Sequence, residues 1–394
     1  MRKRLLSAID QLAPKLKEVS LFIHKNPEIA FEEHKAQEAL TRLLEASRFD
    51  VKRGVGGLAT AFTGEFGSGS SRPVIGFIAE YDALPGIGHG CGHNLIGSAS
   101  VGAAMALASI LGPGACRLKV IGTPAEERGG GKIRLIDAGI FDGLDAAMMV
   151  HPANKTETIK RSLALIDLEI EFFGKASHAA GSPHLGINAL DAVIQTFNNI
   201  AALRQHIRPD ARIHGIITDG GKAPNIIPDY TKARFLIRST DSDYTSLLLD
   251  RVKGCAKGAA VATGAKVKFK IDKNILMPFR PNYTIADIYK GHLKSLGVKM
   301  GIDEEYKEIG SSDIGNVSQV VPTIHPALAI CDYNIAPHSI EFTQAAGSVA
   351  GIKGMLLAAK AISLTALDLI TRPDLLRKVK DEHDRGGPDL GDIG

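Results

Sequence analysis

The pattern of apolar residues changes twice along the chain, and this change constrains the fold more than any other feature. Up to about residue 150, short apolar runs such as 74–79, 118–122 and 146–150 alternate with stretches of helical period. Buried strands that alternate with helices are typical of a layered α/β domain. The segment 166–276 has a different pattern, after which the α/β pattern returns. We therefore predict that a second domain is inserted into the first.

The inserted segment begins with the alternating run ALIDLEIEFF, which is typical of a strand with one exposed face. Helices and strands then follow in the order β-α-β-β-α-β, which is that of a ferredoxin-like sandwich. We expect them near 185–203, 212–218, 231–238, 243–262 and 266–271. The prediction is an α/β domain made of residues 1–165 and 277–394, with a ferredoxin-like α+β domain at 166–276.

Composition excludes some classes of protein. A chain of 394 residues is longer than one ordinary domain. Its 47 basic and 43 acidic residues are interspersed, which gives no electrostatic footprint for nucleic acid. The most apolar stretch, 96–111, is shorter than a membrane span and is typical of a buried helix. The four separated cysteines suggest no disulfide framework. We expect a cytoplasmic protein that binds neither nucleic acid nor membrane.

Side chains that bind metals follow several of the predicted strands. The loop GHGCGHN after the first buried strand carries His89, Cys91 and His93. Ligands of α/β sheets gather beyond the carboxyl ends of the strands, so these side chains are expected to meet others there. The other candidates end two further strands or precede the last helix, and they are Glu126, Glu127, His151 and His338.

Each of these residues also has an ordinary structural explanation. A lone loop histidine more often caps a helix or fills the core than binds a metal. A lone cysteine such as Cys91 is more often a small buried hydrophobe. An adjacent glutamate pair is usually solvated, yet Glu126 and Glu127 follow an apolar strand and precede a glycine run. Four such coincidences at strand ends favour one common site over four separate explanations.

The mixture of residue types indicates the chemistry. Thiolate, imidazole and carboxylate together suit zinc or a borderline metal such as manganese, nickel or cobalt. A divalent metal lowers the pKa of the water that it binds to about 7, and a nearby glutamate can then accept the proton. The chain has no Walker A motif, no complete G-x-G-x-x-G, no G-x-S-x-G and no H-E-x-x-H.

Seven motifs together resemble a known family. They are EYDALPGIGHGCGHN, GTPAEERGGGK, MMVHP, GKASHAAGSPHLGINALDA, APNIIPDYTKARFLIR, GSSDIGNVSQVVPTIHP and APHSIEF, and they span roughly residues 20–350. On these motifs the chain resembles the dinuclear-metal amidohydrolases and exopeptidases that include aminoacylase, carboxypeptidase G, hippurate hydrolase and aminobenzoyl-glutamate hydrolase. The resemblance implies a metallopeptidase catalytic domain with a mixed central sheet flanked by helices. It also implies that the inserted domain is a lid that forms a homodimer.

The resemblance also implies roles for individual residues. It implies two divalent ions, zinc or manganese first and cobalt or nickel as alternatives. Glu126 corresponds to the general base, and His178 corresponds to a histidine that reaches the partner subunit's active site and stabilises the oxyanion. Asn225 and Arg238 lie in the segment that meets the substrate's free carboxylate in relatives. The residues that correspond to metal ligands are Cys91, His93, Glu127, His151 and His338.

The sequence departs from the commoner pattern at a few positions. Many relatives of the cysteine-containing branch carry Asp where this chain has Asn94, and other branches use His and Asp in place of Glu80 and Cys91. The GHN form points to the aminobenzoyl-glutamate or dipeptide-hydrolase branch, and it leaves the number and identity of the metals open. We expect hydrolysis of the amide in an N-acyl amino acid, an aminobenzoyl-glutamate-like compound or a dipeptide, all small molecules with a free carboxylate. The alternatives are a broad-specificity dipeptidase, a non-catalytic binding protein and a structural metal site. The presence of Glu126 and of all five ligands favours an enzyme.

Overall fold

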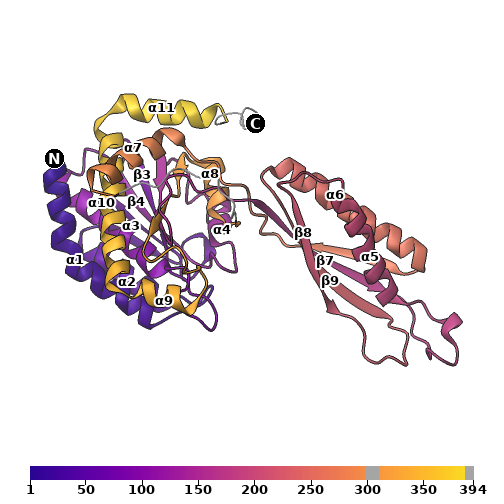
Figure 1. The fold of residues 1–394 in the computed structure, drawn as a ribbon. Helices are drawn as coiled ribbons and strands as arrows, with labels where there is room; N and C mark the ends of the chain where they lie inside the picture. The colour runs from indigo at the N-terminus through magenta and orange to yellow at the C-terminus, as the bar shows by residue number, and fades with distance from the viewer. Residues whose placement is uncertain (299–309, 387–394) are drawn as a thin grey trace. The chain divides into compact units, whose positions relative to one another are not determined.

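The computed structural model describes residues 1–298 and 310–386, and the chain forms two units (Figure 1). Unit 1 contains Met1–Arg161 and the described residues of Phe279–Glu308 and Ser312–Gly394. Unit 2 contains Ser162–Pro278 together with Gly310 and Ser311. Unit 2 is therefore an insertion in the sequence of unit 1.

Unit 1 is built around a six-stranded sheet in the order β1-β2-β4-β3-β5-β11. β3 pairs in parallel with β4 and β5, and β5 pairs in parallel with β11, whereas β1, β2 and β4 pair antiparallel. The predicted mixed central sheet is thus confirmed. The strands are β1 (Asp50–Arg53), β2 (Phe62–Phe66), β3 (Val74–Glu80), β4 (Arg117–Thr123), β5 (Ala146–Met148) and β11 (Thr323–Ile324), and a separate pair joins β6 (His151–Ala153) to β12 (Ala327–Ala329).

Helices flank this sheet, as predicted, and α1, α3 and α10 pack against one another. By length and apolar character alone, α3 and α10 could cross a membrane, but 83% and 67% of the tested stretches are buried in the protein, as in core helices. The helices of unit 1 are α1 (Arg2–Lys25), α2 (His34–Ala46), α3 (His93–Ile110), α4 (Gly131–Asp137), α7 (Tyr283–Ser295), α8 (Ile314–Val320), α9 (Ile340–Ala346), α10 (Val349–Thr371) and α11 (Pro373–Asp384), with a 3₁₀ turn at Val55–Gly57.

Unit 2 has the predicted ferredoxin-like order. Its antiparallel sheet runs β10-β7-β9-β8, and α5 and α6 pack against each other and on this sheet. Burial along β7 alternates residue by residue, which explains the alternating sequence of this strand. Its elements are β7 (Ala164–Phe173), a 3₁₀ turn (Pro183–Leu185), α5 (Ala189–Arg204), β8 (Arg212–Asp219), β9 (Tyr230–Ser239), α6 (Ser242–Thr263) and β10 (Lys266–Ile271).

The parallel core of the unit 1 sheet determines where polar side chains can meet. β3, β4 and β5 run in the same direction, so their carboxyl ends, at Glu80, Thr123 and Met148, lie along one edge. All seven residues of β3 are buried, which is why this strand appears in the sequence as a continuous apolar run. The segments that follow these three strands carry the candidate site.

Candidate metal centre

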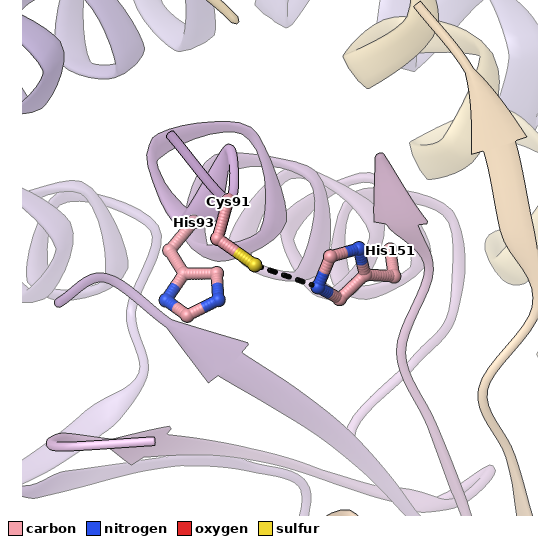
Figure 2. Close-up of side chains that lie close together, drawn as sticks. All are labelled: Cys91, His93 and His151. Atoms are coloured by element: carbon pink, nitrogen blue, oxygen red, sulfur yellow. Dashed lines mark hydrogen bonds between the residues drawn. The ribbon is translucent and has the colours of Figure 1, made fainter. Parts of the chain in front are cut away.

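The structure brings all five predicted metal ligands together in unit 1. Ligand atoms of Cys91, His93 and His151 lie within 4.8 Å of one another (Figure 2). Two further groups overlap with this one and meet the same distance limit: one joins Cys91 to Glu127 and His338, and the other joins His93 to Glu126 and Glu127. The predicted base and the predicted ligands therefore form one continuous cluster.

A glycine next to the ligands allows this close packing. Gly92 precedes α3 with a left-handed φ of 76°, and a Cβ atom on it would lie 2.5 Å from Pro152 Cγ. A larger residue would push the loop that carries Cys91 away from the strand that carries His151. Position 92 therefore requires glycine, because no side chain fits between this loop and the strand that carries His151.

Hydrogen bonds orient two of the imidazoles. His93 Nδ1 lies 2.8 Å from Asp82 Oδ1, and His151 Nδ1 lies 2.6 Å from the carbonyl oxygen of Pro152. Because the carbonyl oxygen and the ionised carboxylate only accept, each Nδ1 donates, and Nε2 is the nitrogen left to bind a metal. His151 Nε2 then faces Cys91 Sγ at 3.3 Å. Both rings are thus held in the tautomer that can bind a metal through Nε2.

Several buried acceptors in the cluster have no hydrogen-bond partner among the described residues. They include His93 Nε2 and Glu127 Oε1, which lie 4.0 Å apart. Glu127 Oε1 also lies 3.5 Å from His338 Nε2. Buried polar atoms that converge without forming hydrogen bonds are costly in the protein interior. A divalent cation would satisfy them, and this donor set of thiol, imidazole and carboxylate suits one.

Burial controls the protonation of the cluster. Burial raises the pKa of the Cys91 thiol to about 12. Burial, and then the charge of Lys160, holds the pKa of His151 well below its usual range. Burial, and then repulsion from Glu80, raises the pKa of Glu126. Burial would lower the pKa of His93, but the charges of Cys91, Asp82 and Glu80 raise it well above its usual value. A cation that binds here must therefore displace the protons of Cys91 and His93, whereas His151 is already neutral.

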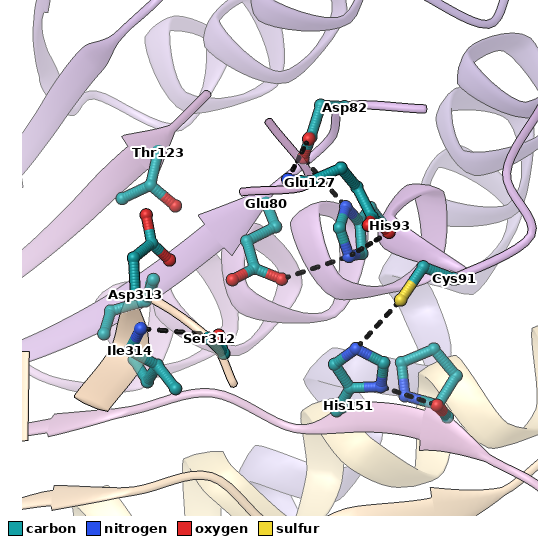
Figure 3. Close-up of polar contacts among 12 residues, drawn as sticks. Glu80, Asp82, Cys91, His93, Thr123, Glu127, His151, Ser312, Asp313 and Ile314 are labelled. Atoms are coloured by element: carbon teal, nitrogen blue, oxygen red, sulfur yellow. Dashed lines mark hydrogen bonds and ion pairs between the residues drawn. The ribbon is translucent and has the colours of Figure 1, made fainter. Parts of the chain in front are cut away.

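No role was assigned from the sequence to three charged residues beside the cluster, of which Figure 3 labels Glu80 and Asp313. The ammonium of Lys132 lies 2.6 Å from both Glu80 Oε1 and Asp313 Oδ1, and all three side chains are buried. Burial would lower the pKa of Lys132, but Asp313 and then Glu80 raise it far above its usual value. Glu80 Oε2 lies 3.5 Å from His93 Nε2. Lys132 therefore holds a carboxylate next to a predicted ligand.

Comparison with known proteins identifies the family. Residues 164–274 match the family described as peptidase dimerisation domain. The chain is 40% identical to the Xaa-Arg dipeptidase of Mus musculus over 97% of its length and 92% of the relative's. It is 32% identical to one of the subunits of the p-aminobenzoyl-glutamate hydrolase of Escherichia coli K12, with 92% and 90% covered. The chain belongs to the M20 family of metallopeptidases. It is therefore a hydrolase of amide or peptide bonds.

The M20 fold is also seen in solved structures. The Bacillus subtilis YXEP protein, described as a dinuclear metal-binding peptidase of the M20 family, matches with a TM-score of 0.72 at 19% identity. The match covers 92% of this chain and 99% of that one. At this identity the likeness concerns the fold, and it extends over both units of the M20 chain.

The remaining predicted residues of this M20 protein lie in unit 2. His178 is exposed, and its Nδ1 accepts hydrogen bonds from the backbone of Ala180 (3.2 Å) and Gly181 (3.0 Å). Its Nε2 is therefore the nitrogen that carries the proton in the neutral ring. Asn225 lies beside it, because the carbonyl of Asn225 accepts from the Ala179 N–H at 3.0 Å. The structure thus brings His178 and Asn225 together.

Arg238 lies on β9 and is half-buried. Its Nη1 donates to Ser311 Oγ at 3.4 Å, and its buried Nε has no partner among the described residues. Burial lowers the pKa of this guanidinium. Within the described parts of the chain, no carboxylate forms an ion pair with Arg238. The guanidinium can therefore donate hydrogen bonds to the carboxylate of a bound molecule.

Proposed function

We propose that this M20 metallopeptidase hydrolyses the amide bond of a small dipeptide that ends in a free carboxylate, with two divalent metal ions. The observation that carries the proposal is that His93 Nε2 and Glu127 Oε1 converge beside Glu126 with no hydrogen-bond partner among the residues that the structure describes. The 40% identity to an Xaa-Arg dipeptidase supports dipeptides with a C-terminal arginine as the first substrates to test.

Five residues would hold the metals, and zinc or manganese suits their donor atoms best, with cobalt and nickel as alternatives. Bound there, the metals would polarise the scissile carbonyl and lower the pKa of bound water. Asp82 and the carbonyl of Pro152 keep two of the imidazoles oriented toward the site. The ligands are Cys91, His93, Glu127, His151 and His338.

Glu126 would act as the general base. It is half-buried next to the ligand Glu127, and its carboxylate lies within the group formed with His93. In this role it accepts a proton from the attacking water and returns it to the leaving amine nitrogen. Its raised pKa brings it nearer to neutrality, where a base works most efficiently.

Unit 2 would complete the site through a homodimer. The match to a peptidase dimerisation domain supports this assembly. β8 is an edge strand of its sheet, and it exposes 64% of Ile216 and 42% of Ile217. In such a dimer His178 Nε2 donates to the developing oxyanion in the partner's site, and Asn225 and Arg238 bind the substrate carboxylate.

A second substrate class is favoured by a separate comparison. The 32% identity to part of a p-aminobenzoyl-glutamate hydrolase supports an N-acyl amino acid whose acyl group is aromatic.

The four cysteines, which are free thiols, support a cytoplasmic location for either activity.

One experiment tests the proposal. The protein is stripped with a chelator, reloaded with Mn²⁺ or Zn²⁺, and assayed on Xaa-Arg dipeptides, other dipeptides, aminobenzoyl-glutamate and N-acetyl amino acids. We expect metal-dependent turnover that falls by roughly 10²–10⁴-fold in Glu126→Gln, while the metal content stays unchanged. Turnover that is unchanged after chelator treatment, or that stays at the wild-type rate in Glu126→Gln, would contradict the mechanism.

A further inference from the structure

Besides the predicted ligand His338, which has a φ of 64°, two residues near the metal centre have a backbone conformation that side chains disfavour. Ala125 has a φ of 60° and Phe31 has a φ of 65°. For a residue with a Cβ atom this left-handed conformation brings Cβ too close to the following carbonyl oxygen. Such conformations persist where the surroundings impose them, and they gather at functional sites. Ala125 directly precedes Glu126 and Glu127.

One carboxylate contacts both of these residues. Glu33 Oε1 accepts hydrogen bonds from the Phe31 N–H at 3.0 Å and from the Ala125 N–H at 2.9 Å. Its second oxygen accepts from Thr60 Oγ1 at 2.8 Å. Glu33 is fully buried, so these three donors replace the water that its carboxyl group lost on folding.

The position of Glu33 on α2 does not explain its burial. Glu33 is the N-cap residue of α2, but its side chain makes no capping hydrogen bond. Glu28 serves that end of the helix instead, because its carboxylate accepts from the N–H groups of Lys35 (2.9 Å) and Ala36 (3.0 Å). The carboxyl group of Glu33 is thus free to act on the turn that carries the proposed base.

That turn is held on both sides of Glu126. Glu33 binds the Ala125 N–H, and Asp82 Oδ2 accepts from the Glu127 N–H at 3.0 Å. Two neighbouring glycines lie too close to this turn and to Phe31 to carry a side chain. A Cβ atom on Gly129 would lie 2.4 Å from Phe31 Cε2, and one on Gly131 would lie 1.9 Å from the Pro124 carbonyl oxygen.

We propose that Glu33 is a positioning residue, which holds Ala125 in its left-handed conformation and so directs Glu126 and Glu127 into the metal centre. It acts through the backbone and does not touch substrate or metal. The catalytic part of this role rests on the proposed function of Glu126, and the metal-binding part does not.

Four variants test the role. Glu33→Met keeps the side chain's length but removes both acceptors. Glu33→Gln keeps one oxygen for the two backbone N–H groups, and Thr60 can reverse its hydroxyl to accept from the amide. Glu33→Met/Ala125→Gly removes the acceptor and also the need for it, because glycine adopts the left-handed conformation freely. Glu28→Met is the matched control, since it loses hydrogen bonds to α2 but none to Ala125.

Four quantities are measured on each variant: kcat and KM on the best substrate, the Mn²⁺ dissociation constant of the metal-free protein by calorimetry, and the melting temperature. We expect Glu33→Met to lower kcat by about 10–100-fold, with a smaller change in KM, because a displacement of about 1 Å can cost a hundredfold. It should also weaken Mn²⁺ binding. Glu33→Gln should stay within about threefold of wild type, since the backbone hydrogen bonds survive. The double variant should recover most of the kcat and Mn²⁺ affinity that Glu33→Met loses. Glu28→Met should lower only the melting temperature.

A purely structural role gives a different result. The proposal is wrong if Glu33→Met lowers the melting temperature but leaves kcat and Mn²⁺ affinity at wild-type values. It is also wrong if the double variant Glu33→Met/Ala125→Gly recovers neither kcat nor Mn²⁺ affinity. The Mn²⁺ measurement separates this failure from that of the proposed function. A protein that hydrolyses none of the amides still shows whether Glu33→Met weakens metal binding and whether Ala125→Gly restores it.

Discussion

The ammonium of Lys132 lies 2.6 Å from Glu80 Oε1 inside unit 1, where Lys132 is fully buried and Glu80 is 1% exposed. Asp313 Oδ1 contacts the same ammonium at 2.6 Å, and Asp313 Oδ2 accepts from the Lys132 N–H. One ammonium thus pairs with two buried carboxylates, and removing it would leave both without this cationic partner.

We therefore expect Lys132→Met to destabilise the protein by about 3–5 kcal/mol, the usual cost of breaking a buried ion pair. The measurement is the free energy of unfolding in urea. Lys360→Met is the control, because Lys360 lies 2.6 Å from Asp10 with 61% of the Asp10 side chain exposed. A surface pair of this kind contributes about 0–1 kcal/mol. Similar losses in the two variants would mean that the buried network does not hold unit 1 together.

The sequence predicted the elements whose burial is regular and missed those whose burial is not. β3 is buried at every position and β7 at alternate positions, so both periods are visible in the sequence. β1 has no buried residue and β11 has two residues, so neither gives a pattern. Residues 343–368 form one Ala-rich apolar run in the sequence, but α9 ends at Ala346 and Ser348 caps α10 by accepting from the Gly351 N–H. Ser348 is a capping residue, but it lies within a continuous apolar run, so the start of a new helix there is not evident from the sequence.

The residues of the candidate site could likewise be predicted from the sequence only in part. Cys91 and His93 could be found because ligand-type residues stand out after an apolar strand. The contact between Lys132 and Asp313 joins residues 181 positions apart, and that between Glu33 and Ala125 joins residues 92 positions apart. Lysine and glutamate are ordinary surface residues in composition, so only the folded chain shows that these are buried and what they bind.

Metal binding should depend on pH through Cys91. Burial raises the pKa of its thiol to about 12, so at neutral pH the metal must displace a proton. Affinity for Zn²⁺ should therefore weaken as the pH falls, and Cys91→Ser should lose metal because a hydroxyl is far less acidic. Elemental analysis after dialysis at several pH values measures this. Cys116→Ser is the control, a buried cysteine outside the cluster. A fully metallated Cys91→Ser protein would show that Cys91 is a packing residue.

Stability should depend on pH through Glu33. Burial raises its pKa from 4.5 to about 7, against the opposing hydrogen bond from Thr60. Between these values the folded protein holds a proton that the unfolded chain releases, so stability falls as the pH rises from 4.5 to 7. The contribution of one such group is at most about 3 kcal/mol. We expect urea unfolding of Glu33→Gln to show a shallower fall over this range than that of wild type, and parallel curves would place the pKa of Glu33 at its ordinary value.

The free carboxylate of the substrate should matter if Arg238 binds it. The planar fork of arginine suits a carboxylate, and lysine does not reproduce it. Arg238→Lys should therefore raise KM or lower kcat/KM on free acids, with little effect on the poor turnover of the corresponding amides. The assay compares each dipeptide with its C-terminal amide in both proteins. Equal turnover of the free acids and their C-terminal amides would show that Arg238 and Asn225 do not bind the substrate carboxylate.

The last prediction concerns the proposed action of His178 across a dimer. Its Nδ1 already accepts two backbone hydrogen bonds, so the exposed Nε2–H is free to donate to an oxyanion, and loss of one such donor costs about 2.7–4 kcal/mol in barrier height. His178→Ala and Glu126→Gln proteins, each nearly inactive alone, are mixed and allowed to exchange subunits. If His178 acts in the partner's site, each mixed dimer regains one intact site of its two. Half of the dimers are mixed after random exchange of equal amounts, so activity should return to about a quarter of wild type. If His178 acts within its own chain, no mixed dimer has an intact site and activity stays absent. The same outcome would follow if the protein is monomeric, which a sedimentation measurement at the assay concentration distinguishes.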